Sequence, residues 1–293
     1  MPRPHIEPYV ELNDDWKKMT LKTMPQGMLN NMLSFDTDSG ACSMKVRFES
    51  GAKMKPSFSH SEIELFILKG KLKLGDATYG EGQYFFIPAG VALPELTAST
   101  GCEALLYFNS CEPNFVESDA DHPSADRAGF STVNAYADMP WAVSKRSPSV
   151  ATGCMTKILH VDQRSLACTF LYFMTPEFWQ DNISYHDCAE ESYHIWGTSW
   201  MMQFGELPTG GYFWRPPYIN HGAFASKRGT IALGRTDSNL FNHFHFNPWT
   251  NPEDNQERAA SRLLHRNADL FKWVIQRDHN HPHTTDFEYD QSR

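Results

Sequence analysis

Short apolar or alternating segments, each bounded by turn residues, run along most of the chain. In the N-terminal half these segments are residues 41–48, 64–68, 71–74 and 103–108. In the C-terminal half they are residues 155–160, 166–173, 199–204 and 229–233. Runs of this length between Gly, Pro or Asp are typical of strands in a sandwich or barrel. The pattern therefore predicts an all-β protein with two groups of strands.

A polar stretch without periodicity separates the two groups. We expect residues 116–147 to connect two domains, residues 1–115 and residues 148–250, because loss of periodicity together with Asp and Pro marks a loop. A chain of 293 residues is long enough for two such domains with proper cores. The sequence therefore predicts two tandem β domains, followed by residues 251–293 as a C-terminal extension.

The C-terminal extension has the pattern of a helix. Asn251 and Pro252 suit a helix start, since a capping residue and a proline at the first helical position are favoured there. Apolar residues then recur at helical intervals, at Ala260, Leu263, Leu264, Leu270, Phe271, Val274 and Ile275. We expect this helix to pack on a barrel or on a partner subunit, and we expect a homo-oligomer, most simply a dimer.

Charge and composition exclude several classes of protein. The formal net charge is −9 and the isoelectric point is near 5.8, with no basic stripe to neutralise phosphates, so we expect no nucleic-acid partner. No segment approaches the ~20 apolar residues that span a bilayer, and the N-terminus lacks the apolar part of a signal peptide. We therefore expect a cytoplasmic protein without a membrane partner. The six cysteines form no CxxC pair, which argues against a zinc ribbon or a disulfide framework.

His186, Glu190 and His221 have the spacing of metal ligands. Residues 184–197 read as one strand, on which His186 and Glu190 would share a face. Residues 210–222 read as a strand, a proline turn and a second strand that could place His221 opposite them. Any one such histidine alone is more often a hydrogen-bonded core residue, but the joint spacing favours a metal site. Two imidazoles and one carboxylate suit zinc, iron, manganese or nickel.

The same spacing resembles the cupin family. The residues that match its first motif are His186, Glu190 and Gly197, and those that match its second motif are Gly210, Pro216 and His221. Cupins usually carry a further histidine two positions before the first of these, where this chain has Ser184, and a glycine where it has Tyr218. The resemblance therefore implies a three-ligand site of two histidines and one carboxylate.

The N-terminal half contains a degraded copy of the pattern. The matching residues are His60, Glu64 and Gly70 for the first motif, and Gly82, Pro88 and Gly90 for the second. Leu93 stands where the last histidine belongs, and a stable site normally needs at least three protein ligands, so we expect no metal there. The resemblance thus implies a bicupin over about residues 30–250: two tandem double-stranded β-helix (jelly-roll) barrels, with the metal in the C-terminal one.

Aromatic and basic residues surround the predicted site in sequence. Tyr185, Trp196, Tyr212 and Trp214 are candidates for a substrate pocket, although barrel interiors hold such side chains for packing alone. Arg215 could bind a substrate carboxylate or phenolate through two hydrogen bonds.

Three other features near the motifs have several candidate roles each. His194 could be a fourth ligand, a general base, a residue that orients Glu190, or a core residue. Cys188 could ligate metal or act as a nucleophile, but such a residue is more commonly a buried thiol. His243 and His245 form an HxH pair outside the motifs, at a site mouth or an interface, and His279, His281 and His283 could bind metal adventitiously.

The resemblance to cupins does not fix a reaction. The ligand set favours a metal-dependent enzyme that acts on a small oxygenated organic molecule, in particular a non-haem iron dioxygenase, because open coordination positions suit dioxygen and substrate. A zinc- or manganese-dependent lyase, hydrolase or isomerase could use the same residues. A different class is a non-catalytic binding or sensor bicupin, for which the ChrR-like cupins offer a precedent.

Overall fold

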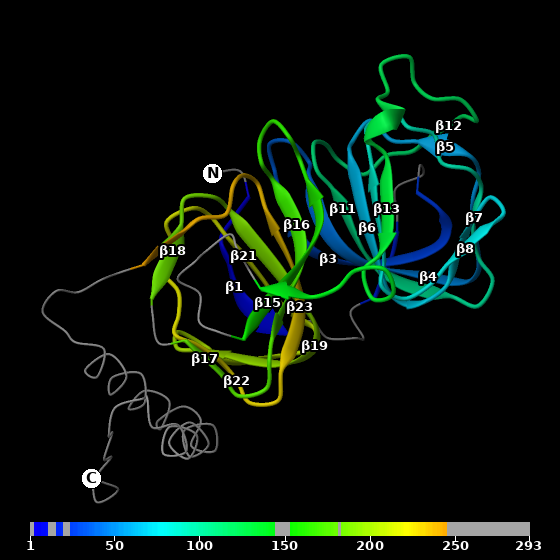
Figure 1. Ribbon diagram of the computed structural model, residues 1–293. Coiled ribbons are helices and arrows are strands. Elements are labelled where there is room, and N and C mark those ends of the chain that lie inside the picture. Colours follow the sequence, from blue (N-terminus) through cyan, green and yellow to red (C-terminus); the bar gives the residue numbers. More distant parts are fainter. Residues whose placement is uncertain (1–2, 11–15, 20–23, 144–152, 181–182, 245–293) are drawn as a thin grey trace, which may run out of the picture. The chain divides into compact units, whose positions relative to one another are not determined.

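The computed structural model describes residues 3–10, 16–19, 24–143, 153–180 and 183–244 (Figure 1). The chain divides into two compact units. Unit 1 consists of Met1–Ile6 and Leu12–Pro140, and unit 2 consists of Glu7–Glu11 and Trp141–Arg293. The described residues are almost entirely strands and turns, with one short 3-10 helix, η1 (Arg127–Gly129). None of these described segments is a helix long and apolar enough to cross a membrane. The all-β prediction is confirmed.

Unit 1 is a curled antiparallel sheet (Figure 1). Its strands are β2 (Lys17–Lys18), β3 (Gln26–Phe35), β4 (Cys42–Met54), β5 (Ser57–Phe58), β6 (Ile63–Gly70), β7 (Leu72–Leu74), β8 (Ala77–Tyr79), β9 (Gln83–Ile87), β10 (Leu96–Ala98), β11 (Cys102–Phe108), β12 (Val116–Glu117) and β13 (Ser131–Asn134). The main sheet has the order β13-β9-β6-β11-β4-β10-β7-β8, and β3 also pairs with β4. Alternate residues of the long strands enclose one hydrophobic core, as Ile63, Leu65 and Ile67 of β6 do.

Unit 2 repeats this architecture. Its strands are β1 (Ile6–Val10), β14 (Ala142–Val143), β15 (Cys154–Val161), β16 (Cys168–Met174), β17 (Phe178–Gln180), β18 (Ser184–His186), β19 (Glu190–Met201), β20 (Gly205–Pro208), β21 (Gly211–Arg215), β22 (Phe224–Ser226), β23 (Thr230–Thr236) and β24 (Asn242–Phe244). The main sheet has the order β1-β21-β19-β23-β16-β15-β14. The long strand β19 pairs with β21 and β23 and, toward its end, with β20 and β22. It therefore links both parts of the barrel wall.

The unit boundaries differ from those expected in two places. Residues 116–140 belong to unit 1 because β12 pairs with β5 and β13 pairs with β9. Residues 7–11 belong to unit 2 because β1 pairs with β21. Both additions are edge strands with half-exposed side chains, so they lack the strong apolar pattern that marks a core strand. The predicted C-terminal helix of residues 251–293 and the residues His245, His279, His281 and His283 lie outside the described residues.

The two barrels can be compared position by position. Gly70 and Gly197 both have a positive φ, +83° and +82°, and in both an added Cβ would meet a backbone carbonyl within 2.4 Å. Each barrel also has one isolated bridge, Ser57 with Leu93 in unit 1 and Ser184 with His221 in unit 2. The shared geometry fixes the correspondence of residues and supplies an internal reference for the site in unit 2.

Candidate metal centre

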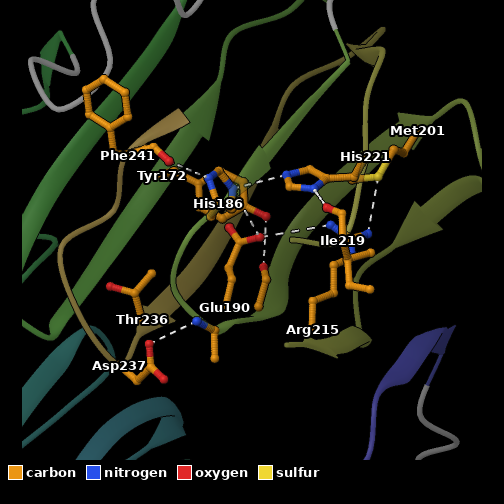
Figure 2. A network of polar contacts seen from close by, with 12 residues as sticks. Tyr172, His186, Glu190, Met201, Arg215, Ile219, His221, Thr236, Asp237 and Phe241 are labelled. Atoms are coloured by element: carbon orange, nitrogen blue, oxygen red, sulfur yellow. Dashed lines mark hydrogen bonds and ion pairs between the residues drawn. The ribbon is translucent and has the colours of Figure 1, made fainter. Parts of the chain in front are cut away.

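The structure brings His186, Glu190 and His221 together in unit 2 (Figure 2). One ligand atom from each lies within 4.8 Å of the others. His186 ends β18 and Glu190 begins β19, so the expectation that both stand on one strand is wrong. They meet because residues 187–189 form a bend between the two strands, and not because of strand alternation. His221 lies in the loop between β21 and β22, where its backbone exchanges two hydrogen bonds of 2.8 Å with Ser184.

Backbone carbonyls orient both imidazoles. The Nδ1 atom of His186 lies 3.2 Å from the carbonyl oxygen of Phe241, and the Nδ1 atom of His221 lies 2.8 Å from that of Ile219. A carbonyl only accepts, so each Nδ1 donates its proton and each Nε2 keeps a free lone pair. The two Nε2 atoms are 3.1 Å apart, and that of His186 is 3.6 Å from Glu190 Oε2. Two lone pairs held this close repel each other unless a cation lies between them.

These distances fit a divalent metal ion. Two nitrogen ligands that meet at a right angle, with metal–nitrogen bonds of about 2.1 Å, are about 3.0 Å apart. Burial lowers the pKa of His221 well below its ordinary value, with further contributions from Arg215 and His186, so this imidazole is neutral as a metal ligand must be. Two neutral imidazoles and one carboxylate form the donor set of non-haem iron sites, and they also suit zinc, manganese and nickel.

The loops that carry the ligands are held by backbone contacts. The amide of Tyr218 donates to the carbonyl of His186 at 2.8 Å, and the equivalent amide of Gly90 in unit 1 donates to Ser59 at 2.7 Å. Tyr218 has a φ of +69°, the conformation that Gly90 adopts at +79°. The chain thus keeps the glycine geometry of the second cupin motif with a tyrosine. Asp237 accepts from the amide of Ala189 at 2.9 Å and so fixes the bend before Glu190 (Figure 2). Sequence reasoning missed Asp237.

Unit 1 has no histidine or carboxylate at the positions that correspond to the three candidate ligands of unit 2. From the shared register, the unit 1 counterparts of His186, Glu190 and His221 are Ser59, Ile63 and Leu93. Ile63 and Leu93 belong to the hydrophobic core of unit 1. The polar residues of unit 2 are therefore not required to build this barrel.

The residues that the sequence suggested for unit 1 are one position out of register. Glu64 is the counterpart of Glu191: it is buried and accepts from Tyr84 Oη at 2.6 Å, as Glu191 accepts from Tyr212 Oη at 2.7 Å. His60 is exposed. A shift of one residue moves a side chain to the other face of a strand. The segment from Ser59 to Gly70 is as long as that from His186 to Gly197, so only the alignment that begins at His60 is one residue short.

Arg215 lies beside the three ligands. It is only 4% exposed, and its Nη1 atom is 3.9 Å from Glu190 Oε2. Its Nη2 atom donates to the sulfur of Met201 at 3.2 Å, and the guanidinium lies 4.0 Å from the centre of the Phe213 ring. The counterpart of the Glu190–Arg215 cross-strand pair in unit 1 is Ile63–Ile87.

His194 also faces the cavity. It is 1% exposed, its Nε2 lies 2.8 Å from Ser199 Oγ, and its Nδ1 has no hydrogen-bond partner among the described residues. Burial, helped by the charge of Arg215, lowers the pKa of His194 to about 3. The imidazole is therefore neutral at physiological pH, where it is a weak base and a hydrogen-bonding group. The ring nitrogens of His194 do not belong to the cluster of possible metal ligands that His186, Glu190 and His221 form.

The cavity that contains the site has a volume of about 120 Å³. Its polar lining includes the three ligands, Arg215, His194, Ser199, Gln180 and Tyr172, and its apolar lining includes Ile158, Phe170, Met174, Phe178, Leu207, Phe213, Phe224 and Leu240. An engineered cavity of about 150 Å³ holds a benzene molecule, so the space suits a molecule of comparable size. Sequence reasoning did not name Tyr172, Phe213 or Gln180 as cavity residues.

The four aromatic pocket candidates lie elsewhere. Tyr212 and Trp214 alternate with the cavity residues Phe213 and Arg215 along β21, so they point to the opposite face of the strand. Trp196 is 52% exposed and follows a register shift in β19. Tyr185 stacks on His243 at a ring distance of 4.9 Å, outside the cavity lining.

Cys188 and His243 do not join the site. Cys188 is buried outside the cavity lining, and burial, followed by the charge of Glu190, raises the pKa of its thiol to about 12. The thiol is therefore protonated in the metal-free protein at physiological pH, and Cys188 does not belong to the cluster that His186, Glu190 and His221 form. His243 Nε2 lies 3.4 Å from Asp187 Oδ2, a half-exposed pair.

Glu191 provides a test that separates structure from metal binding. Its carboxylate accepts from Tyr212 and, at 2.5 Å, from Arg235 Nη1, and its side chain is 6% exposed. Glu191→Gln removes the buried carboxylate that pairs with the Arg235 guanidinium, which is 14% exposed, so we expect unit 2 to lose about 3 kcal/mol of stability in chemical denaturation. Metal content per folded chain should equal that of the wild type. Loss of metal from folded Glu191→Gln would mean that the ligand set is assigned to the wrong glutamate.

Comparisons with known proteins agree with the two-barrel fold. A protein from Nostoc punctiforme PCC 73102, named a "putative dioxygenase", is 19% identical with a TM-score of 0.77, over 84% of this chain and 92% of that one. The Ylba protein of E. coli is 14% identical with a TM-score of 0.55, over 80% and 93%. A mutant of the oxalate decarboxylase OxdC of Bacillus subtilis is 12% identical with a TM-score of 0.52, over 81% and 78%. At these identities the likeness shows the fold alone, which is cupin-like.

No curated protein sequence matches the chain. One family model does match it, over residues 10–243, and its description is "Domain of unknown function (DUF4437)". This range includes all three candidate ligands and Arg215. Because the model spans more than half of the chain, the protein belongs to the DUF4437 family.

Proposed function

We propose that unit 2 binds one divalent transition metal ion through His186, Glu190 and His221, and that the protein is a non-haem iron dioxygenase for a small oxygenated organic molecule. The observation that carries the proposal is the convergence of two Nε2 lone pairs, 3.1 Å apart, on the carboxylate of Glu190. Both imidazoles are fixed by backbone carbonyls, so neither Nε2 is needed for the fold.

The internal comparison supports a functional origin for these groups. Unit 1 builds the same barrel with Ile63 and Leu93 at two of the three ligand positions. Buried polar and ionic groups generally stabilise a fold less than well-packed apolar residues do. Their presence in unit 2 is therefore better explained by ligand binding than by stability.

The side chains around the ligands have distinct roles in this proposal. A bound ferrous ion would supply Lewis acidity and one-electron chemistry with dioxygen. Arg215 offers a fixed positive charge next to Glu190, and neutral His194, held by Ser199, offers Nδ1 to a substrate oxygen. The apolar wall, with Phe213 and Phe224, limits water in the cavity and so strengthens each polar contact there.

Oxygen uptake tests the reaction class. Metal-free protein is loaded anaerobically with Fe²⁺ and mixed with small 2-oxo acids, 2-hydroxy acids and phenolic acids in a closed oxygen electrode. We expect substrate-dependent oxygen uptake by the iron form, and none by the zinc form or by His221→Leu, which copies Leu93 of unit 1.

Two results would contradict the proposal. Conversion of a substrate by the zinc or manganese form without oxygen uptake would replace the dioxygenase by a lyase, hydrolase or isomerase that uses the same ligands. Absence of tight metal binding by any form would remove the metal centre itself and favour a bicupin that only binds small molecules.

A further inference from the structure

The guanidinium of Arg215 is buried without a matching acceptor. Its Nη1 atom makes no hydrogen bond to any described residue, and its Nη2 atom donates only to the thioether of Met201. A thioether is a weak acceptor. The Oε2 atom of Glu190 is 3.9 Å from Nη1, beyond hydrogen-bonding distance. Arg215 therefore presents a charged group to the cavity whose Nη1 donors have no acceptor among the described residues.

The fold does not explain this residue. In unit 1 the position is Ile87, which is packed in the core, and its cross-strand partner is Ile63. A buried charge is costly unless it is paired and hydrogen-bonded. Arg215 is 4% exposed and poorly paired, so its partner is most simply a ligand that the cavity admits.

The charge balance of the cavity indicates the sign of that ligand. Among the cavity-lining residues, Glu190 and Arg215 are the ionised side chains, and their charges cancel. The imidazoles of His186 and His221 add no charge when they bind a metal ion, because only the neutral ring is a ligand. A divalent ion at the three ligands would thus leave a net charge of about +2, which favours an anion. The negative charge of Glu7 in β1 also acts on Arg215, but the Glu7 side chain is exposed to solvent and does not line the cavity.

The geometry around Arg215 indicates the chemical class. A planar guanidinium offers parallel N–H donors that match the two oxygens of a carboxylate. The ring of Phe213, 4.0 Å from the guanidinium carbon, packs against it and supports its orientation. Apolar side chains line the other parts of the cavity, among them Phe170, Phe178 and Leu240. The site thus combines an anion anchor beside the metal ligands with an apolar space of about 120 Å³.

We propose that the substrate is a small monocarboxylate with an apolar or aromatic body, and that Arg215 binds its carboxylate next to the metal ligands. This inference rests on the proposed function, because it names the substrate class of the same site. It assigns Arg215 to substrate binding and leaves the metal to His186, Glu190 and His221.

Matched acids and amides test the inference without turnover. Full-length protein that carries glutamine at His279, His281 and His283 is loaded with zinc, which has no redox activity. It is titrated by calorimetry with acetate, isobutyrate and benzoate, and with acetamide, isobutyramide and benzamide. We expect the acid that fits best to bind at least about tenfold more tightly than its amide, since a hydrogen-bonded charge pair is worth about 1.4 kcal/mol or more. Arg215→Gln should abolish this preference, and Arg215→Lys should retain part of it.

The control and the metal analysis separate the two proposals. His243→Gln removes a half-exposed imidazole outside the cavity and should keep the wild-type preference. Equal binding of acids and amides, or an undiminished preference in Arg215→Gln, would overturn the inference. Zinc content is measured on every sample: bound zinc without a preference for acids leaves the metal centre standing, whereas a preference without bound zinc leaves the anion site standing alone.

Discussion

Replacing Glu190 and Arg215 together by isoleucine is expected to abolish metal binding and yet to leave unit 2 at least as stable as in the wild type. The double variant copies the Ile63–Ile87 pair, which occupies the same cross-strand positions in the core of unit 1. Replacing a buried ion pair by well-packed apolar residues is often neutral or stabilising by about 1–4 kcal/mol. Urea unfolding of the metal-free proteins measures the effect.

The single variants provide the contrast. Glu190→Ile leaves the guanidinium of Arg215 without its nearest carboxylate, and we expect a loss of about 3–5 kcal/mol. The double variant should therefore be much more stable than the sum of the two single effects predicts, which is a large coupling energy in the double-mutant cycle. A double variant that is less stable than Glu190→Ile would show that these residues stabilise the fold, against a purely functional role for the pair.

Motif spacing predicted the candidate metal ligands well, but the residues of the cavity wall were predicted poorly. The three candidate ligands were predicted from motif spacing, which survives large sequence change, and the structure brings them together. The supposed single strand is in fact two strands joined by a bend. Tyr212 and Trp214 were misplaced because strand alternation along β21 turns them away from the cavity. Phe213 lies two residues from Arg215 and therefore points to the same face of the strand, whereas Tyr212 and Trp214 point to the other face. Strand alternation thus predicts Phe213 as the cavity residue.

Other features could not be read from one sequence. The pairing of β1 with β21 joins residues far apart in the chain, and its edge strand carries little apolar pattern. The motif match in unit 1 was placed one residue out of register because His60 was aligned with His186. The bridge between Ser57 and Leu93 and the pairing of β6 with β9 give the correct register. The cavity residue Tyr172 lies on β16, outside both motifs, and no spacing rule points to it.

His221→Leu is expected to weaken metal binding more than about 100-fold, because the variant retains two protein ligands where a stable site normally has at least three. Leucine is the residue at this position in unit 1, so the variant should fold. Saturating metal at about 1,000 times its dissociation constant should stabilise the wild type by about 4 kcal/mol and should stabilise the variant little. Thermal unfolding with and without added metal gives this comparison.

The most direct test of the metal centre is the metal content of purified, reconstituted protein by elemental mass spectrometry. All proteins carry glutamine at His279, His281 and His283, so that these residues cannot contribute. Near-stoichiometric metal is expected in the wild type and in the control His60→Ala, whose imidazole is exposed in unit 1. His221→Leu should contain almost none. Equal metal in all three proteins, or none in any after reconstitution, would contradict a centre formed by His186, Glu190 and His221.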